Sequence, residues 1–213
     1  MYANFFKRVL DFTLSLCALI VLSPILLVLM IVGVIAMGGN PFFTQLRPGK
    51  IGKDGKEKIF KLIKFRTMDN QKDKEGNLLP DEVRLNKYGK FLRSTSLDEL
   101  PELINILVGD MSIVGPRPLL VRYLPYYTEE ERVRHKVRPG LTGYAQAHGR
   151  NTVTWDEKLS MDVWYVAHIS LITDLRILID TILIVLKRES VEVEGVEALD
   201  VYRIRTAEQE SIQ

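Results

Sequence analysis

The sequence has almost no cysteine, no internal repeat and almost no net charge. Its 213 residues include one cysteine, Cys17, so a disulfide within the chain is excluded, which is consistent with a cytoplasmic location for the folded part. The length suits one folded unit with a sizeable core. The net charge of +2 hides an uneven distribution, because residues 41–93 carry fourteen Lys and Arg against seven Asp and Glu. Such a block suits an anionic partner: a phosphorylated substrate, a membrane surface or nucleic acid.

A long stretch near the N-terminus lacks charge altogether. Residues 12–37 are twenty-six consecutive uncharged residues, which exceeds the roughly 20 that a helix needs to span a bilayer. The apolar run is also too long for a cleaved signal peptide, and Gly38–Pro41 offers no small-residue cleavage pattern. We therefore expect this segment to stay on the mature protein and to lie in lipid.

Basic residues flank this segment on both sides, at positions 7–8 before it and within 47–58 after it. The positive-inside rule places such residues in the cytoplasm, so a single crossing leaves one basic flank on the wrong side. A re-entrant hairpin keeps both flanks cytoplasmic. Ser23 and Pro24 are near the middle of the run, where proline removes a backbone hydrogen bond and the serine hydroxyl can satisfy the freed carbonyl. The alternative is a single span kinked at Pro24.

The stretch richest in chemistry runs from Ser94 to Pro118. Ser96 followed three residues later by Glu99 is a capping-box signature, which predicts a helix that starts here with Asp98 and Glu99 in its first turn. The positive end of the helix dipole would then favour an ionised Asp98, suited to act as a nucleophile or a metal ligand. Acidic residues in a first turn are more often simple caps, and that interpretation stays open.

Downstream, the segment Gly115-Pro116-Arg117-Pro118 holds an arginine between two prolines. A short rigid loop of this kind is suited to presenting the guanidinium of Arg117 to a phosphate. This loop favours a functional interpretation of the two carboxylates that precede it.

Four motifs, in this order and spacing, resemble the bacterial sugar transferase family, the monotopic phosphoglycosyl transferases. They are Lys-Phe-Arg-Thr-Met at 64–68, Ser-Leu-Asp-Glu-Leu-Pro-Glu-Leu at 96–103, Gly-Asp-Met-Ser-Ile-Val-Gly-Pro-Arg-Pro at 109–118 and Arg-Pro-Gly-Leu-Thr-Gly at 138–143. The resemblance covers nearly the whole chain, to about residue 188. Among the small members of the family, the chain is most similar to the PglC-like proteins that start N-linked glycan assembly.

The resemblance implies transfer of a phosphosugar from a UDP-sugar to undecaprenyl phosphate, with release of UMP and with Mg²⁺ as cofactor. The donor would carry an N-acetylated amino sugar such as diacetylbacillosamine, although this chain has His148 where most of the family has asparagine. Asp98 would be the covalent nucleophile and a metal ligand, and Glu99 would be a second catalytic residue that helps to hold the ion or to orient the nucleophile. Ser23 and Pro24 match the break of the family's membrane hairpin. The candidate substrate-binding residues are Lys64, Arg93, Arg117, Arg138 and Arg150.

Shorter patterns predict the remaining elements. We expect two short strands within residues 42–66, the first limited to 42–45, and a surface loop over 69–82. His135, between two basic residues, is expected at the surface. After residue 188 we expect a variable or partly disordered tail. Four helices are expected. A basic amphipathic helix covers 84–93, and a second helix covers 119–136, with a break near Pro125 and a restart at 129–132. A third covers 156–167, with Asp162 and Tyr165 on one face, and a fourth covers 174–186, with a cap near Asp174.

Together these elements predict an α/β fold, mostly helical with short strands. We expect a re-entrant membrane hairpin over 1–40, a compact cytoplasmic phosphoglycosyl transferase domain over 41–188 and a C-terminal tail over 189–213. The protein would lie at the cytoplasmic face of the bacterial inner membrane. Its partners would be membrane lipid, the two substrates and downstream glycosyltransferases, without nucleic acid. The alternatives are a membrane glycosyltransferase that releases UDP and a non-catalytic scaffold that binds acidic lipid or nucleic acid.

Overall fold

The computed structural model describes residues 2–149, 153–187 and 197–212. Its longest element is helix α1, Lys7–Met37, which follows a short π-helical turn, Tyr2–Phe6. Of the described helices, α1 alone is long and apolar enough to cross a membrane by length and composition. It ends at Gly38, where a left-handed backbone (φ 60°) lets the next amides return to the last helical carbonyls.

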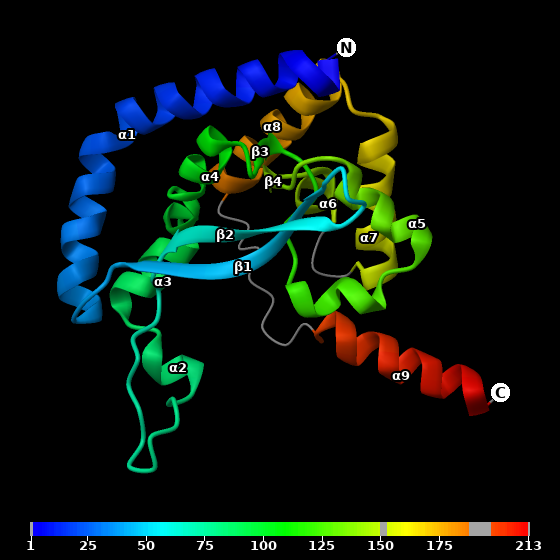
Figure 1. Cartoon of the computed structure of the whole chain (residues 1–213). Coiled ribbons are helices and arrows are strands. Elements are labelled where there is room, and N and C mark those ends of the chain that lie inside the picture. Colours follow the sequence, from blue (N-terminus) through cyan, green and yellow to red (C-terminus); the bar gives the residue numbers. More distant parts are fainter. Residues whose placement is uncertain (1, 150–152, 188–196, 213) are drawn as a thin grey trace.

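Pro24 bends α1 without ending it. The helix is continuous and curves near its middle (Figure 1). Proline has no N–H to donate to the carbonyl of Ile20, and the hydroxyl of Ser23 donates to that carbonyl instead, at 2.7 Å. The hydroxyl of Ser23 thus satisfies the carbonyl freed by Pro24, as predicted. The predicted break between two helices is instead a bend within one continuous helix.

Polar contacts tie both halves of α1 to the rest of the protein. In the first half, the guanidinium of Arg8 donates to two carbonyls near the end of α4 (Glu102–Val108), at 2.6 and 2.7 Å, and the carboxylate of Asp11 accepts from the hydroxyl of Ser112 at 2.7 Å. In the second half, the hydroxyl of Tyr88 donates to a carbonyl of α1 at 2.7 Å. Both halves of α1 are therefore held against the same folded domain.

An antiparallel hairpin of β1 (Phe42–Ile51) and β2 (Glu57–Phe65) follows α1 and crosses the molecule (Figure 1). The sequence predicts both strands, but β1 is longer than predicted. Successive side chains point to opposite faces of a strand. Phe60 and Leu62 are accordingly buried in the core, whereas Ile59 is exposed.

Helix α3 (Lys87–Ser94) matches most of the helix predicted over 84–93, and a short helix, α2 (Asp81–Arg84), forms where the sequence predicts the end of a surface loop. α3 starts later than predicted because Asn86 caps it, and the side-chain oxygen of Asn86 accepts from the amide of Gly89 at 2.9 Å.

Two three-residue strands, β3 (Ser112–Val114) and β4 (Gly140–Thr142), pair in parallel. The sequence predicts one broken helix over 119–136 between them, and its restart is correct because Thr128 and Glu131 form a capping box. The pieces are the 3₁₀ helices Val121–Tyr126 and Val133–Lys136 and helix α5, Glu129–Arg132.

Helices α6 (Tyr144–His148) and α7 (Trp155–Ala167) follow β4. Asp162 and Tyr165 lie on one face of α7, as predicted, and both are buried. The hydroxyl of Tyr165 donates to the carbonyl of Val114 at 3.1 Å, so α7 holds the end of β3.

Helix α8 (Leu171–Leu186) begins earlier than predicted. Its cap is Ser170, whose side chain accepts from the amide of Thr173 at 3.1 Å. Asp174, the predicted cap, is instead buried and pairs with Lys7 of α1 at 2.6 Å. Several apolar side chains of α8 are exposed, for example Ile172 and Ile179.

The C-terminal tail contains a helix, so the prediction of a partly disordered tail is wrong for its described part. Helix α9, Leu199–Ile212, extends at the edge of the molecule (Figure 1). The side chain of Leu199 is fully buried, and Arg203 pairs with Asp156 of α7 at 2.8 Å. Leu199, the packing of Tyr202 and polar contacts with Asp156 attach α9, and these contacts follow no regular pattern that the sequence would reveal.

Candidate functional site

The helix predicted to start at Ser96 starts later. Ser96 has a φ of 54° and its side chain makes no capping hydrogen bond, so the capping-box prediction is wrong. A 3₁₀ turn, Leu97–Glu99, comes first, and α4 begins directly after Pro101. Proline suits this place because it has no N–H that the helix would leave unsatisfied. The two adjacent acids therefore lie in the 3₁₀ turn ahead of the helix.

Three carboxylates surround the ammonium group of Lys64, near the end of β2. Its Nζ lies 2.6 Å from Glu99 Oε1, 3.3 Å from Glu102 Oε1 and 3.9 Å from Asp98 Oδ2. None of the four side chains is more than 21% exposed. We call these residues the Lys64 cluster.

Arg117 reaches the cluster from the loop that follows β3. Its Nη2 donates to Glu99 Oε1 at 3.1 Å. The side chain is 48% exposed, so its remaining donors are open to a ligand from solvent. A small cavity of about 20 Å³ lies beside Arg117 and Lys64, and Arg47 and Glu102 also line it.

Burial and neighbouring charges act differently on the three carboxylates. Burial raises the pKa of Asp98, although the charge of Lys64 opposes the rise, so the shift is opposite to the one expected for the first turn of a helix. Burial also acts to raise the pKa of Glu99, but the charges of Arg117 and Lys64 prevail and lower it to about 2. Burial and the charge of Glu99 raise the pKa of Glu102 to about 7. One carboxylate is thus firmly ionised beside another that takes up a proton near neutral pH.

Glu102 is the member of the cluster that the sequence reasoning missed. It follows Asp98 by four residues and Glu99 by three, spacings that put side chains on one side of a helix. That signal is present in the sequence, but a glutamate just after a proline also suits an ordinary helix start.

Arg93 and Arg138, the other predicted substrate-binding residues that the structure describes, form hydrogen bonds with groups outside the cluster. The Nε of Arg93 donates to the hydroxyl of Thr67 at 3.2 Å, and that of Arg138 donates to the carbonyl of Gly109 at 2.9 Å. Arg150 lies outside the described residues.

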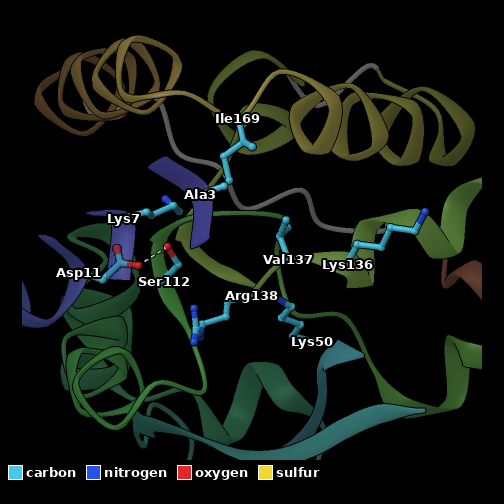
Figure 2. Close-up of a pocket in the computed structure, with 9 residues that line it drawn as sticks. All are labelled: Ala3, Lys7, Asp11, Lys50, Ser112, Lys136, Val137, Arg138 and Ile169. Carbon is cyan, nitrogen blue, oxygen red and sulfur yellow. Dashed lines mark hydrogen bonds between the residues drawn. The ribbon is translucent and has the colours of Figure 1, made fainter. Parts of the chain in front are cut away.

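Arg138 lines a second cavity, of about 40 Å³, near the start of α1. Asp11, Lys7 and Lys50 also line it, whereas the residues of the Lys64 cluster do not (Figure 2). The side chain of Lys136 points away from Lys7, so the cations around this cavity do not converge on one point (Figure 2).

His135 is buried, so its predicted surface position is wrong. It is only 4% exposed, because the 3₁₀ helix Val133–Lys136 turns it toward β1, where Nδ1 lies 3.3 Å from the carbonyl oxygen of Gly49. Burial and the charge of Arg134 lower its pKa to about 4. His135 therefore belongs to the core beneath β1.

A magnesium ion fits this site only if a substrate supplies part of its ligands. Within the described ranges, no group of three His, Cys, Asp or Glu side chains is arranged to hold an ion. Mg²⁺ prefers oxygen ligands and is usually bound through one or two carboxylates together with substrate phosphates. Asp98 is such a carboxylate, so the residues present fit an ion shared with a diphosphate.

The family model for bacterial sugar transferases matches residues 2–188. The chain belongs to the bacterial sugar transferase family. The resemblance inferred from the four motifs is thereby confirmed, and the closer likeness to PglC-like members stays a prediction.

Curated relatives of the family support the same class. The chain is 49% identical to the uncharacterized sugar transferase EpsL of Bacillus subtilis, covering 87% of this chain and 90% of that protein. It is 39% identical to the UDP-glucose:undecaprenyl-phosphate glucose-1-phosphate transferase of Klebsiella pneumoniae and 35% identical to the undecaprenyl-phosphate galactose phosphotransferase of Salmonella typhimurium. These matches cover 83% and 88% of this chain but only 39% and 42% of those two longer proteins. The protein is a transferase.

Proposed function

We propose that this transferase moves a phosphosugar from a UDP-sugar to undecaprenyl phosphate and releases UMP. The observation that carries the proposal is the position of Asp98 in one site with two cations, Lys64 and the half-exposed Arg117. A nucleophilic carboxylate beside cations that bind phosphate is what two-step phosphoryl transfer needs. The names of the Klebsiella and Salmonella relatives state reactions of this class.

The reaction would proceed in two displacements at one phosphorus atom. A carboxylate oxygen of Asp98 attacks the phosphorus attached to the sugar, the bond to the bridging oxygen breaks, and UMP leaves with that oxygen. Asp98 then carries the phosphosugar as an acyl phosphate. An oxygen of the lipid phosphate attacks the same phosphorus, the bond to Asp98 breaks, and the carboxylate is regenerated.

The neighbouring residues would orient the reactants and balance charge. Arg117 clamps the phosphate oxygens, and Lys64 favours the ionised form of Asp98. Glu99 is bound to both cations and so holds them in place. Mg²⁺, held by Asp98 and the diphosphate, would supply neutralisation of charge on the phosphates.

The acceptor is a lipid, which agrees with the apolar surface of the protein. Apolar side chains on α1 and α8 are widely exposed, for example Ile35 at 78% and Ile172 at 64%. A re-entrant α1, supported by the contacts of both its halves with one domain, would place the site at the cytoplasmic face of the bacterial inner membrane. There the phosphate of a polyprenol is within reach, and downstream glycosyltransferases can take up the product.

We propose that the sugar is the N-acetylated amino sugar implied by the PglC-like motifs, such as diacetylbacillosamine, as in protein glycosylation. Glucose and galactose, named in two relatives, are the other donors to compare.

The test is nucleotide release by the detergent-solubilised full chain, given Mg²⁺, undecaprenyl phosphate and a panel of UDP-sugars. UMP from one donor, lost in Asp98→Asn, supports the proposal and names the sugar. UDP would show that the sugar alone is transferred. Release of neither nucleotide, together with salt-dependent binding of acidic lipid or nucleic acid, would favour the scaffold.

A further inference from the structure

In the loop that carries Arg117, the main chain of every residue from 114 to 118 makes a hydrogen bond to another part of the protein. Five different partners make these contacts, and they come from α7, β4, β1 and the 3₁₀ helix Val133–Lys136. The hydrogen bonds are Tyr165 Oη to Val114 O (3.1 Å), Gly115 N to Thr142 O (2.9 Å), Gly140 N to Pro116 O (3.0 Å), Arg134 Nη2 to Arg117 O (2.7 Å) and Arg47 Nη1 to Pro118 O (3.1 Å).

The contact to Arg117 itself comes from a buried ion pair. Arg134 and Asp162 are 3% and 4% exposed, and Asp162 Oδ2 accepts from Nε and Nη2 of Arg134 at 3.0 and 2.8 Å. The same Nη2 donates to the carbonyl of Arg117 at 2.7 Å. One guanidinium therefore joins α7 to the residue whose side chain reaches the Lys64 cluster.

The chemistry of arginine suits this double contact. Its planar fork can donate to a carboxylate and a carbonyl at the same time, which the single ammonium of a lysine does poorly. A charged donor also makes a stronger hydrogen bond to a carbonyl than a neutral one does. Asp162 supplies the opposite charge without which a buried guanidinium would be strongly destabilising.

The side chain of Arg117 needs such support. It is half exposed, and in the structure a single nitrogen bonds it to Glu99. The direction in which the guanidinium points therefore depends on how firmly its own main chain is held. A shift of about 1 Å in a positioned group can lower a rate by about 10²-fold.

We propose that Arg134, held by Asp162, is a positioning residue that fixes the main chain of Arg117 and so aims its guanidinium at the Lys64 cluster. The inference rests on the proposed function in that it takes this cluster as the reacting site. The hydrogen bonds that carry it do not depend on the identity of the substrate.

The test replaces both members of the pair at once, as Arg134→Gln with Asp162→Asn, so that no uncompensated charge is left in the core. A matched control replaces the neighbouring pair, Arg132→Gln with Glu57→Gln, whose 2.8 Å contact does not touch the loop. Each double variant is made in the parent and in the Arg117→Ala background. The readout is kcat/KM for UMP release.

The positioning pair should lower kcat/KM by about 10²-fold in the parent background, as expected for a shift of about 1 Å. In the Arg117→Ala background it should change kcat/KM by less than about threefold, because coupled residues are non-additive. The control pair should have little effect in either background. An equal loss in both backgrounds would overturn the proposal, because a general loss of folded protein acts on both alike.

Amide hydrogen exchange gives a second readout that needs no substrate. The amides of Gly115 and Gly140 should exchange faster in the Arg134/Asp162 variant than in the parent and the control. Equal protection in all three proteins would overturn the proposal. If the parent releases no UMP from any donor, the proposed function fails, and this measurement alone decides whether Arg134 positions the loop.

Discussion

Replacing Glu102 by glutamine removes a buried acid whose pKa rises from 4.5 to about 7 on folding, through burial and the charge of Glu99. A raised pKa means that folding favours the protonated form. The contribution of Glu102 to stability is therefore complete below pH 4.5 and is lost as the pH rises through about 7. Glutamine has the shape of the protonated acid and does not titrate, so the variant avoids this loss.

The size of the effect follows from the shift. One pKa unit corresponds to about 1.4 kcal/mol, so a rise from 4.5 to about 7 corresponds to about 3 kcal/mol. In a chain of this length, 1 kcal/mol changes Tm by about 2–4 °C. The Tm of Glu102→Gln relative to the parent should therefore rise by about 6–12 °C between pH 4.5 and pH 8.5.

Thermal unfolding of the detergent-solubilised protein, followed by circular dichroism in steps of pH, measures this difference. Glu130→Gln, at an exposed position on α5, is the control and should show no such trend. A Tm difference between Glu102→Gln and the parent that stays constant over this range would refute the reasoning.

Three other substitutions test separate parts of the account. Arg117→Ala should lower kcat and kcat/KM by about 10²–10³-fold, because a clamp on the transferring phosphoryl group acts mainly in the transition state, and a change confined to KM would count against that role. Gly140→Ala should prevent folding, since a Cβ would lie 2.1 Å from the amide nitrogen of Gly115, and a parental Tm would contradict this close contact. Asp11→Ala should lower the free energy of unfolding by about 3 kcal/mol, because it removes a buried carboxylate that accepts hydrogen bonds from Ser112 and Ile113. An unchanged Tm would show that this contact of α1 does not stabilise the protein.

The sequence predicts those features of this protein that depend on local patterns. The charge-free run marks α1, alternation and turn residues mark the hairpin, and the spacing of Asp162 and Tyr165 places them on one face of α7. The two adjacent acids, Lys64 and Arg117 also meet as the motifs imply. In each case a few neighbouring residues carry the signal.

What the sequence does not predict depends on context beyond a single short motif. Ser96 and Glu99 match the sequence pattern of a capping box, but the helix starts only after Pro101, and the two adjacent acids lie in a 3₁₀ turn. His135 has a charged neighbour on each side in the sequence, but it is buried in the structure because a 3₁₀ helix turns its side chain inward. Arg134 and Asp162 are twenty-eight residues apart, and only the fold brings them to the loop of Arg117.

The central claim is a covalent phosphosugar on Asp98. Intact-protein mass spectrometry of the full chain, mixed with Mg²⁺ and the accepted UDP-sugar but without undecaprenyl phosphate, tests it directly. The account predicts a mass increase equal to one phosphosugar, which disappears when undecaprenyl phosphate is added and is absent in Asp98→Asn. Turnover to UMP by Asp98→Asn at the parental rate, or an adduct that persists in that variant, would contradict it.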